Sequence, residues 1–132
     1  ASHYGEGKQV EVRGSEEGFL GSWYAARVIE AKEGRACLRL HLCYLAFQEE
    51  DGSLWEDWLD HHMVRPMPPE SQEDFIHGLK KGAALEVSIE AGWWEVELVS
   101  RDGSKFLVES KRYKVRASSQ PALRTTPPPR VS

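Results

Sequence analysis

The stretch GFLGSWYAARVIEA, residues 18–31, decides the fold, and the stretch AGWWEVELVS, residues 91–100, repeats its plan. Each stretch places two aromatic residues side by side after a glycine, and small or apolar residues recur at alternate positions after them. The aromatic pairs are Trp23–Tyr24 and Trp93–Trp94. Successive side chains of a β-strand point to opposite faces, so this alternation is typical of a strand with one face in a core. The same kind of strand is therefore predicted twice in one chain.

Further strand patterns surround both stretches. Residues 36–44, ACLRLHLCY, alternate most regularly, and one predicted face carries Leu38, Leu40, Leu42 and Tyr44. The other predicted strands are KQVEV (8–12), SLWEDW (53–58), HMVRP (62–66), GAALEVSI (82–89), SKFLVES (104–110) and RYKVRA (112–117). The order of patterns repeats after about 70 residues, which suits two small tandem barrels.

The predicted fold is therefore all-β, with two tandem small antiparallel barrels packed together. The first barrel is expected over residues 5–68, and the second, with a C-terminal tail, over residues 79–128. The proline-rich segment PMPPESQED (66–74) marks the break between them, so residues 69–78 are expected to be a linker that contains a short helix. Residues 118–132 contain few large apolar side chains and are expected to have little regular structure.

The charge of the chain is unevenly distributed. Residues 1–100 carry 19 acidic and 9 basic side chains, a net charge of −10, whereas residues 101–132 carry 2 and 8, a net charge of +6. The segment EEDGSLWEDWLD (49–60) has six acids and no lysine or arginine. An acidic, aromatic surface favours a cationic partner over a phosphate backbone, although such a segment is also compatible with a simple solvated loop. No run approaches the roughly 20 apolar residues of a membrane span, so no membrane partner is expected.

The reactive side chains form no recognisable catalytic arrangement. Neither a nucleophile in a known setting nor a glycine-rich phosphate loop is present, so neither an enzyme activity nor a cofactor is expected. Cys37 and Cys43 lie six residues apart in one predicted strand, about 20 Å, and are expected to be free thiols. Adjacent His61 and His62 would point to opposite faces of a strand, so no metal site is expected.

The aromatic residues of the first half suggest a binding site. Tyr24 and Tyr44 each end the inward-facing series of their predicted strands, so both rings are expected at the mouth of the first barrel, and Phe47 follows in the next loop. Several aromatic faces together can hold a methylated ammonium through cation–π contacts. A carboxylate beside them can accept the N–H that dimethyl-lysine retains. The alternative is that these rings simply plug one end of the barrel.

The segment VEVRGSEEGFLGSWYAARVIEA (10–31), followed by VRPMPP (64–69), resembles a plant Agenet domain, a member of the Tudor-like "Royal" barrels. The segment GWWEVELV (92–99) resembles the second domain of a tandem Agenet pair, so the resemblance covers residues 5–128. It implies a monomeric pair of Tudor-like barrels that reads histone tails in the nucleus. The implied partner is the N-terminal tail of histone H3 with a methylated lysine, and dimethylation at its ninth residue is the expected mark.

The resemblance also implies which residues bind this partner. The methyl-lysine cage is expected to consist of Tyr24, Tyr44 and Phe47, with Trp23 as a further candidate. The acids expected to contact the basic tail are Glu49, Glu50, Asp51, Asp57 and Asp60. Candidates for the rest of the groove are Phe19, Trp58, His61 and Trp94. If His41, His61 or His62 lines the groove, its protonation would weaken the binding of a cationic tail as the pH falls.

The second half departs from the cage pattern, because Ser110 aligns with Tyr44, and Tyr113 follows three residues later. One methyl-lysine site is therefore expected, in the first barrel. Two other functions remain open. An RNA-binding protein would be consistent with the basic residues after position 100, but the acidic remainder opposes it. A protein-interaction scaffold would bind its partner whether or not a lysine is methylated.

Overall fold

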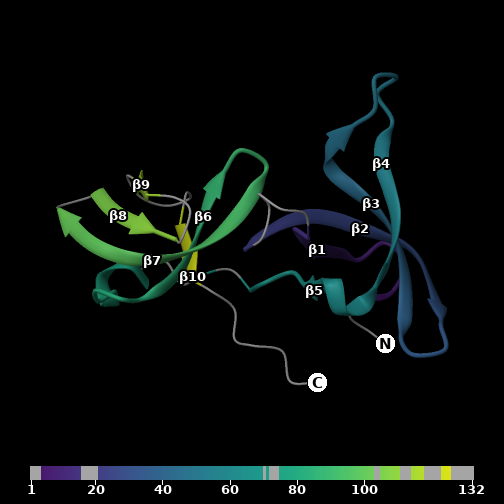
Figure 1. The fold of residues 1–132 in the computed structure, drawn as a ribbon, viewed down its shortest axis with the longest axis horizontal. Helices are drawn as coiled ribbons and strands as arrows, with labels where there is room; N and C mark the ends of the chain where they lie inside the picture. Colours follow the sequence, from purple (N-terminus) through teal and green to yellow (C-terminus); the bar gives the residue numbers. More distant parts are fainter. Residues whose placement is uncertain are drawn as a thin grey trace. The chain divides into compact units, whose positions relative to one another are not determined.

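The structure, a computed structural model, describes residues 4–15, 21–69, 71, 75–102, 105–110, 114–117 and 123–125. It divides into two compact units, Ala1–Met67 and Pro68–Ser132. The regular elements among the described residues are strands and short 3-10 turns, which confirms the all-β prediction (Figure 1). None of the described helical segments is long and apolar enough to cross a membrane.

The first unit is an antiparallel sheet of five strands in the order β5-β1-β2-β3-β4. Its elements are β1 (Gln9–Arg13), β2 (Ser22–Glu33), β3 (Leu38–Gln48), β4 (Leu54–Asp60), the 3-10 turn η2 (His61–Met63) and β5 (Val64–Pro66). The two longest strands of this unit are β2, which contains the predicted strand at 23–31, and β3, which contains residues 38–44 of the predicted strand at 36–44. Because β3 continues to Gln48, Phe47 lies within this strand and not in the loop expected after it. Cys37 precedes β3, Cys43 lies within it, and both are free thiols.

The first unit has the predicted small antiparallel β fold, but its sheet is not closed into a complete barrel. The chain leaves β4 at Asp60, turns through η2 and enters β5, which pairs with β1. β5 has only three residues, and no ladder between described residues joins it to β4. The opening leaves the inner face of β4 accessible.

The second unit repeats the plan of the first, with the order β10-β6-β7-β8-β9. Its elements are the 3-10 turn η3 (Phe75–Gly78), β6 (Ala84–Ile89), β7 (Gly92–Asp102), β8 (Lys105–Glu109), β9 (Lys114–Ala117) and β10 (Leu123–Thr125). Each of these strands has a counterpart in the first unit, since β6, β7 and β8 follow one another as β1, β2 and β3 do.

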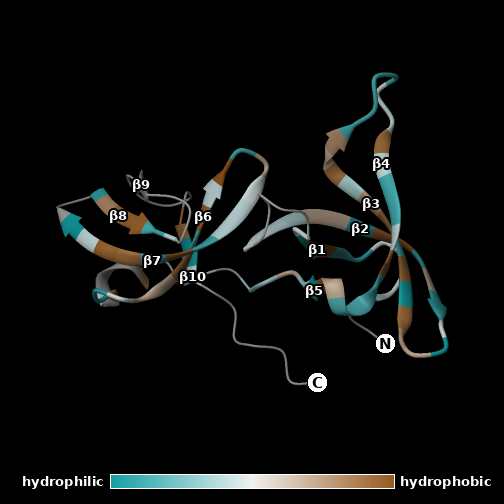
Figure 2. Ribbon diagram, in the orientation of Figure 1, coloured by the Kyte–Doolittle hydropathy of each residue, from teal (hydrophilic) through white to brown (hydrophobic). Residues whose placement is uncertain are grey.

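Alternating residues of the strands fill one core in each unit. Figure 2 shows hydrophobic and hydrophilic segments following one another along the strands. The first core consists of Tyr4, Val10, Val12, Ala26, Val28, Leu40, Leu42 and Val64. The second consists of Leu85, Val87, Trp94, Val96, Leu98, Phe106, Val108 and Leu123. The period-two pattern of the sequence therefore identified the buried face of each long strand.

Two boundaries differ from the sequence-based expectation. Phe75 of η3 and Leu79 pack against the second core, so part of the segment expected to be a linker at 69–78 belongs to the second unit. The tail after residue 117 was expected to lack regular structure, but Leu123–Thr125 forms β10 on the edge of β6. Leu123 is the reason, because its side chain is buried in the second core.

A buried ion pair stacked on a tryptophan lies on the opposite face of the first sheet. Glu11 of β1 is paired in register with Arg65 of β5, and both side chains are buried. The guanidinium donates two hydrogen bonds to Oε1 of Glu11, from Nη2 at 2.7 Å and from Nε at 3.0 Å. It also lies over the ring of Trp23, 4.0 Å from the ring centroid. Trp23 therefore covers this pair.

The second unit contains the same arrangement at equivalent positions. Arg124 of β10 pairs in register with Glu86 of β6 and donates hydrogen bonds of 2.7 and 2.8 Å to Oε1 of that carboxylate. Its guanidinium lies 4.0 Å from the ring centroid of Trp93. The first aromatic residue of each pair, Trp23 or Trp93, thus stacks on an arginine, while the second, Tyr24 or Trp94, faces inward.

Candidate functional site

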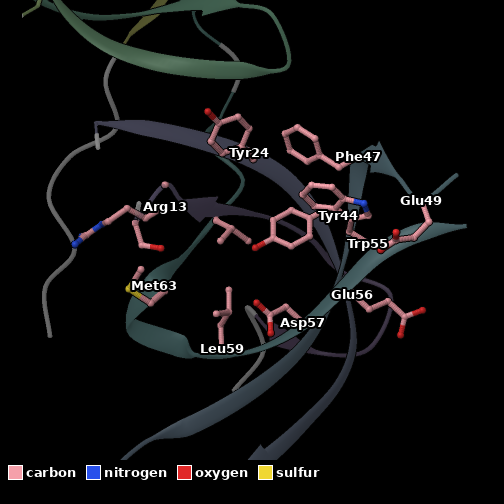
Figure 3. Close-up of a pocket in the computed structure, with 13 residues that line it drawn as sticks. Arg13, Tyr24, Tyr44, Phe47, Glu49, Trp55, Glu56, Asp57, Leu59 and Met63 are labelled. Atoms are coloured by element: carbon pink, nitrogen blue, oxygen red, sulfur yellow. The ribbon is translucent and has the colours of Figure 1, made fainter. Parts of the chain in front are cut away.

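An open pocket of about 480 Å³ lies at one end of the first unit (Figure 3). Its aromatic lining consists of Tyr24, Tyr44, Phe47 and Trp55. Its acidic lining consists of Glu49, Glu56 and Asp57. The other described residues that line it are Val12, Arg13, Gly14, Ser15, Leu59 and Met63. The pocket thus gathers side chains from β1, β2, β3, β4 and η2, and from the turns that follow β1 and β3.

The strand registers bring the aromatic rings together. Tyr24 lies two positions before Ala26, on the same inward face of β2. Ala26 is paired in register with Tyr44 of β3, so the two tyrosine rings lie near each other. Phe47 reaches the same pocket because the register shifts beside it. Cys43 pairs with Glu56 and Gln48 pairs with Leu54, so β3 has more residues than β4 between these two pairs. Such an irregularity in a ladder re-aims the side chains within it.

The four rings pack against one another around Phe47. Its ring centroid lies 5.4 Å from that of Tyr24 at 57°, and 6.0 Å from that of Tyr44 at 73°. The Trp55 ring is 5.3 Å away and nearly parallel, at 25°. Edge and offset contacts of this kind are the favourable arrangements of aromatic pairs. The faces of Tyr24, Tyr44 and Trp55 are thereby held in fixed orientations at the pocket.

Trp55 lines the pocket, whereas Trp58, the residue predicted from the same acidic segment, does not. The period of β4 distinguishes them, because Trp55, Asp57 and Leu59 alternate on one face and Trp58 lies on the other. The Trp58 ring stacks on His41, with centroids 4.9 Å apart, and Lys32 lies over it at 5.4 Å. In the sequence, Trp55 lies four positions before the apolar Leu59 and therefore on the same face of the strand. This spacing was the available signal that Trp55 faces inward.

Trp23 does not line the pocket, which corrects its assignment as a cage candidate. It neighbours Tyr24 in the chain, so in a strand its side chain points to the other face. There it stacks on Arg65, and Arg13 lies 5.6 Å from its ring centroid.

The other groove candidates that the structure describes, His61 and Trp94, do not line the pocket. His61 lies in η2 with Nδ1 3.3 Å from the Leu38 carbonyl oxygen, beside the ring of Tyr4. Trp94 is buried in the core of the second unit. Phe19 lies outside the described residues. None of His41, His61 and His62 lines the pocket, although His41 Nε2 lies 2.9 Å from Glu56 Oε1.

The acidic residues divide into two groups. Asp57 is paired in register with the buried Leu42, so it lies on the inner face of β4, and Glu49 and Glu56 join it at the pocket. Asp60 instead pairs with Arg39, 3.5 Å away, and does not line the pocket.

The other two acids lie in the β3–β4 turn. Glu50 is exposed there. Ser53 donates hydrogen bonds of 2.6 Å from Oγ and 2.9 Å from the backbone N–H to the Asp51 carboxylate. These bonds lower the pKa of Asp51 and fix the turn.

The environment of Tyr44 defines the electrostatics of the pocket. Burial of the ring raises the pKa of its hydroxyl, and the negative charge of Asp57 raises it further. Tyr44 is therefore a neutral phenol at physiological pH. The pocket thus combines neutral aromatic faces with carboxylates, a combination that attracts a cation with an apolar surface.

Among the described residues, the second unit has a serine at the position that Tyr44 occupies in the first unit. Val28 pairs with Leu42 in the first unit, and Leu98 pairs with Val108 in the second. Two residues beyond these partners lie Tyr44 in the first unit and Ser110 in the second. The registers therefore agree with the alignment of Ser110 with Tyr44, whereas Tyr113 lies outside the described residues.

These features define a Tudor-like β module with an aromatic pocket. The family model that matches is that of the Agenet domain, over residues 7–69. The protein is 30% identical over 106 residues to DUF724 domain-containing protein 6 of Arabidopsis thaliana, an alignment that covers 78% of this chain and 15% of the relative. The chain thus spans less than a fifth of that relative.

Solved structures share the fold over nearly the whole chain. The crystal structure of Arabidopsis thaliana AGDP1 AGD34 aligns with a TM-score of 0.80 and 26% identity, covering 95% of this chain and 84% of the other. That of the ADCP1 tandem Agenet domain 3-4 aligns with a TM-score of 0.75 and 21% identity, covering 95% and 82%. The chain belongs to the Agenet family and has the fold of a tandem Agenet pair. Agenet domains are Tudor-like reader modules.

Proposed function

We propose that this protein is a nuclear, non-enzymatic reader of methylated lysine and that the pocket of the first unit binds the N-terminal tail of histone H3 dimethylated at its ninth residue. The observation that carries the proposal is the convergence of four aromatic rings and three carboxylates on one open cavity. A methylated ammonium keeps its charge while its surface becomes apolar, so it suits both kinds of lining.

The aromatic rings, rather than the acids, supply the specificity in this proposal. Exposed ion pairs contribute only about 0.2–1 kcal/mol each, and they do not distinguish methylated from unmethylated lysine. Cation–π contacts contribute about 2 kcal/mol when the cation is desolvated. Glu49 and Glu56 therefore serve mainly to attract a basic tail, and their effect should decrease with ionic strength.

Calorimetric titration with histone H3 tail peptides tests the proposal directly. The peptides are unmodified or carry methyl groups at the fourth, ninth or twenty-seventh residue. Binding to the peptide dimethylated at the ninth residue, with at least tenfold weaker binding of the unmodified peptide, is the expected result. Equal affinity for every peptide would mean that the carboxylates alone attract the tail, and the reader proposal would be wrong.

Asp57 is expected to set the preference for two methyl groups over three. Its carboxylate can accept the single N–H of dimethyl-lysine, which trimethyl-lysine lacks. Asp57→Asn should lower the affinity for the dimethylated peptide about three- to tenfold and leave the trimethylated peptide less affected, because a charge-assisted hydrogen bond is lost.

Asp60→Asn is the matched control for this variant, since Asp60 lies on the same strand but pairs with Arg39 outside the pocket. Titrations of both variants with di- and trimethylated peptides give the comparison. An unchanged ratio of the two affinities in Asp57→Asn would contradict the assigned role.

A further inference from the structure

The pocket is larger than one methylated ammonium requires. The nitrogen, two methyl groups and terminal methylene of dimethyl-lysine are four heavy atoms, which occupy roughly 120 Å³ at about 30 Å³ each. The pocket holds about 480 Å³. The difference leaves room for a second side chain of the ligand in the same cavity.

Tyr44 divides the pocket into two parts. On one side of its ring lie Phe47 and Trp55, which belong to the aromatic cluster. On the other side, Figure 3 shows Leu59 and Met63 facing the cavity. Both of these side chains are half-buried against the core of the unit, as Tyr44 itself is. Leu59 and Met63, the described residues on this side, thus give the second part an apolar, aliphatic wall.

The floor and rim of this second part narrow the choice of occupant. Val12, which is buried and paired in register with Tyr24, contributes to the floor. Arg13 lies at one edge and Asp57 at another (Figure 3). A basic side chain would therefore meet the charge of Arg13, and an acidic one would meet that of Asp57. A short neutral aliphatic side chain avoids both repulsions and covers apolar surface.

We propose that this second part is a subsite for a short aliphatic side chain two residues away from the methylated lysine. In an extended peptide, side chains two positions apart point in the same direction and are separated by about 6.6 Å. A lysine inserted between the aromatic rings therefore directs the side chain two positions away into the same cavity. This subsite, formed by Val12, Leu59 and Met63, rests on the proposed reader function and adds sequence selectivity to it.

The test combines changes in the peptide with changes in the protein. Histone H3 peptides dimethylated at the ninth residue would carry glycine, alanine or valine at residue seven or at residue eleven. At one of these two positions, alanine should bind about fourfold more tightly than glycine, the effect of burying one methyl group. Met63→Ala should reduce this discrimination and weaken binding of the alanine peptide severalfold.

Two controls isolate the subsite from the cage. Met67→Ala removes an exposed methionine that does not line the pocket, so it should leave every affinity unchanged. The single amino acid N-acetyl-dimethyl-lysine methylamide lacks neighbouring side chains. It should therefore bind the original protein and Met63→Ala equally, as measured by NMR titration.

The outcomes separate the subsite from the reader function. If the original protein binds the glycine and alanine peptides equally at both positions, the subsite is wrong, even where binding still depends on methylation. If neither the peptides nor the amino-acid probe depends on methylation, the reader function and the subsite both fail. The peptide series on the unmutated protein decides the matter even if Met63→Ala does not fold.

Discussion

Replacing Tyr44 by alanine is expected to lower the affinity for the dimethylated peptide at least about thirtyfold and to leave the weak binding of the unmodified peptide nearly unchanged. The Tyr44 ring contacts Phe47 and separates the two parts of the pocket. Its removal eliminates one cation–π wall, worth about 2 kcal/mol in a desolvated site, and opens the cage to water. Calorimetric titration of both peptides measures the loss.

Trp58→Ala is the control for Tyr44→Ala. It deletes an aromatic ring on the opposite face of β4, where Trp58 stacks on His41. The affinity for the dimethylated peptide should therefore be retained. If Trp58→Ala abolishes binding while Tyr44→Ala does not, the binding surface lies on the outer face of β3 and β4 instead of in the pocket. Phe47→Ala should resemble Tyr44→Ala, because Phe47 contacts the three other rings.

Arg65→Met is expected to destabilise the first unit by about 3–5 kcal/mol, the largest stability effect we predict. The substitution retains much of the apolar stem but removes the guanidinium that donates two hydrogen bonds to Glu11. It removes this guanidinium from a carboxylate that is 1% exposed, and breaking a buried ion pair from one side costs about this much. The stacking of Arg65 on Trp23 is lost as well.

Urea unfolding monitored by tryptophan fluorescence and circular dichroism measures this loss. The matched control is Lys32→Met, which removes one partner of the exposed Lys32–Glu30 pair, 3.6 Å apart, and should change the unfolding free energy by less than about 1 kcal/mol. The double variant Glu11→Met/Arg65→Met should recover much of the stability, since replacing both charges by apolar groups removes the desolvation cost. Equal stability of Arg65→Met and the original protein would contradict this role of the ion pair.

The local sequence determined the strands and their buried faces. Alternation along residues 23–31 and 36–44 is a property of adjacent residues, and it identified Ala26, Val28, Leu40 and Leu42 as core positions. The internal repeat followed from the same patterns, and it predicted two similar β units. The positions of Tyr24 and Tyr44 could be predicted for the same reason, because each depends on the phase of one strand. Phe47 was expected in the loop after β3, but it lies within that strand, where a shift in the ladder brings it to the pocket.

Tertiary structure alone decided what each aromatic residue touches. The role of Trp23 depends on Arg65, which lies 42 positions later and reaches it only because β1 pairs with both β2 and β5. The phase of β4 places Trp55 on the inner face, but its stacking on Phe47 depends on the shift in the ladder between β3 and β4 after Cys43, and no periodic pattern encodes such a shift. Period-two alternation fixes the face of a side chain, but contacts between distant strands depend on register and bulges, which result from the packing of the whole unit.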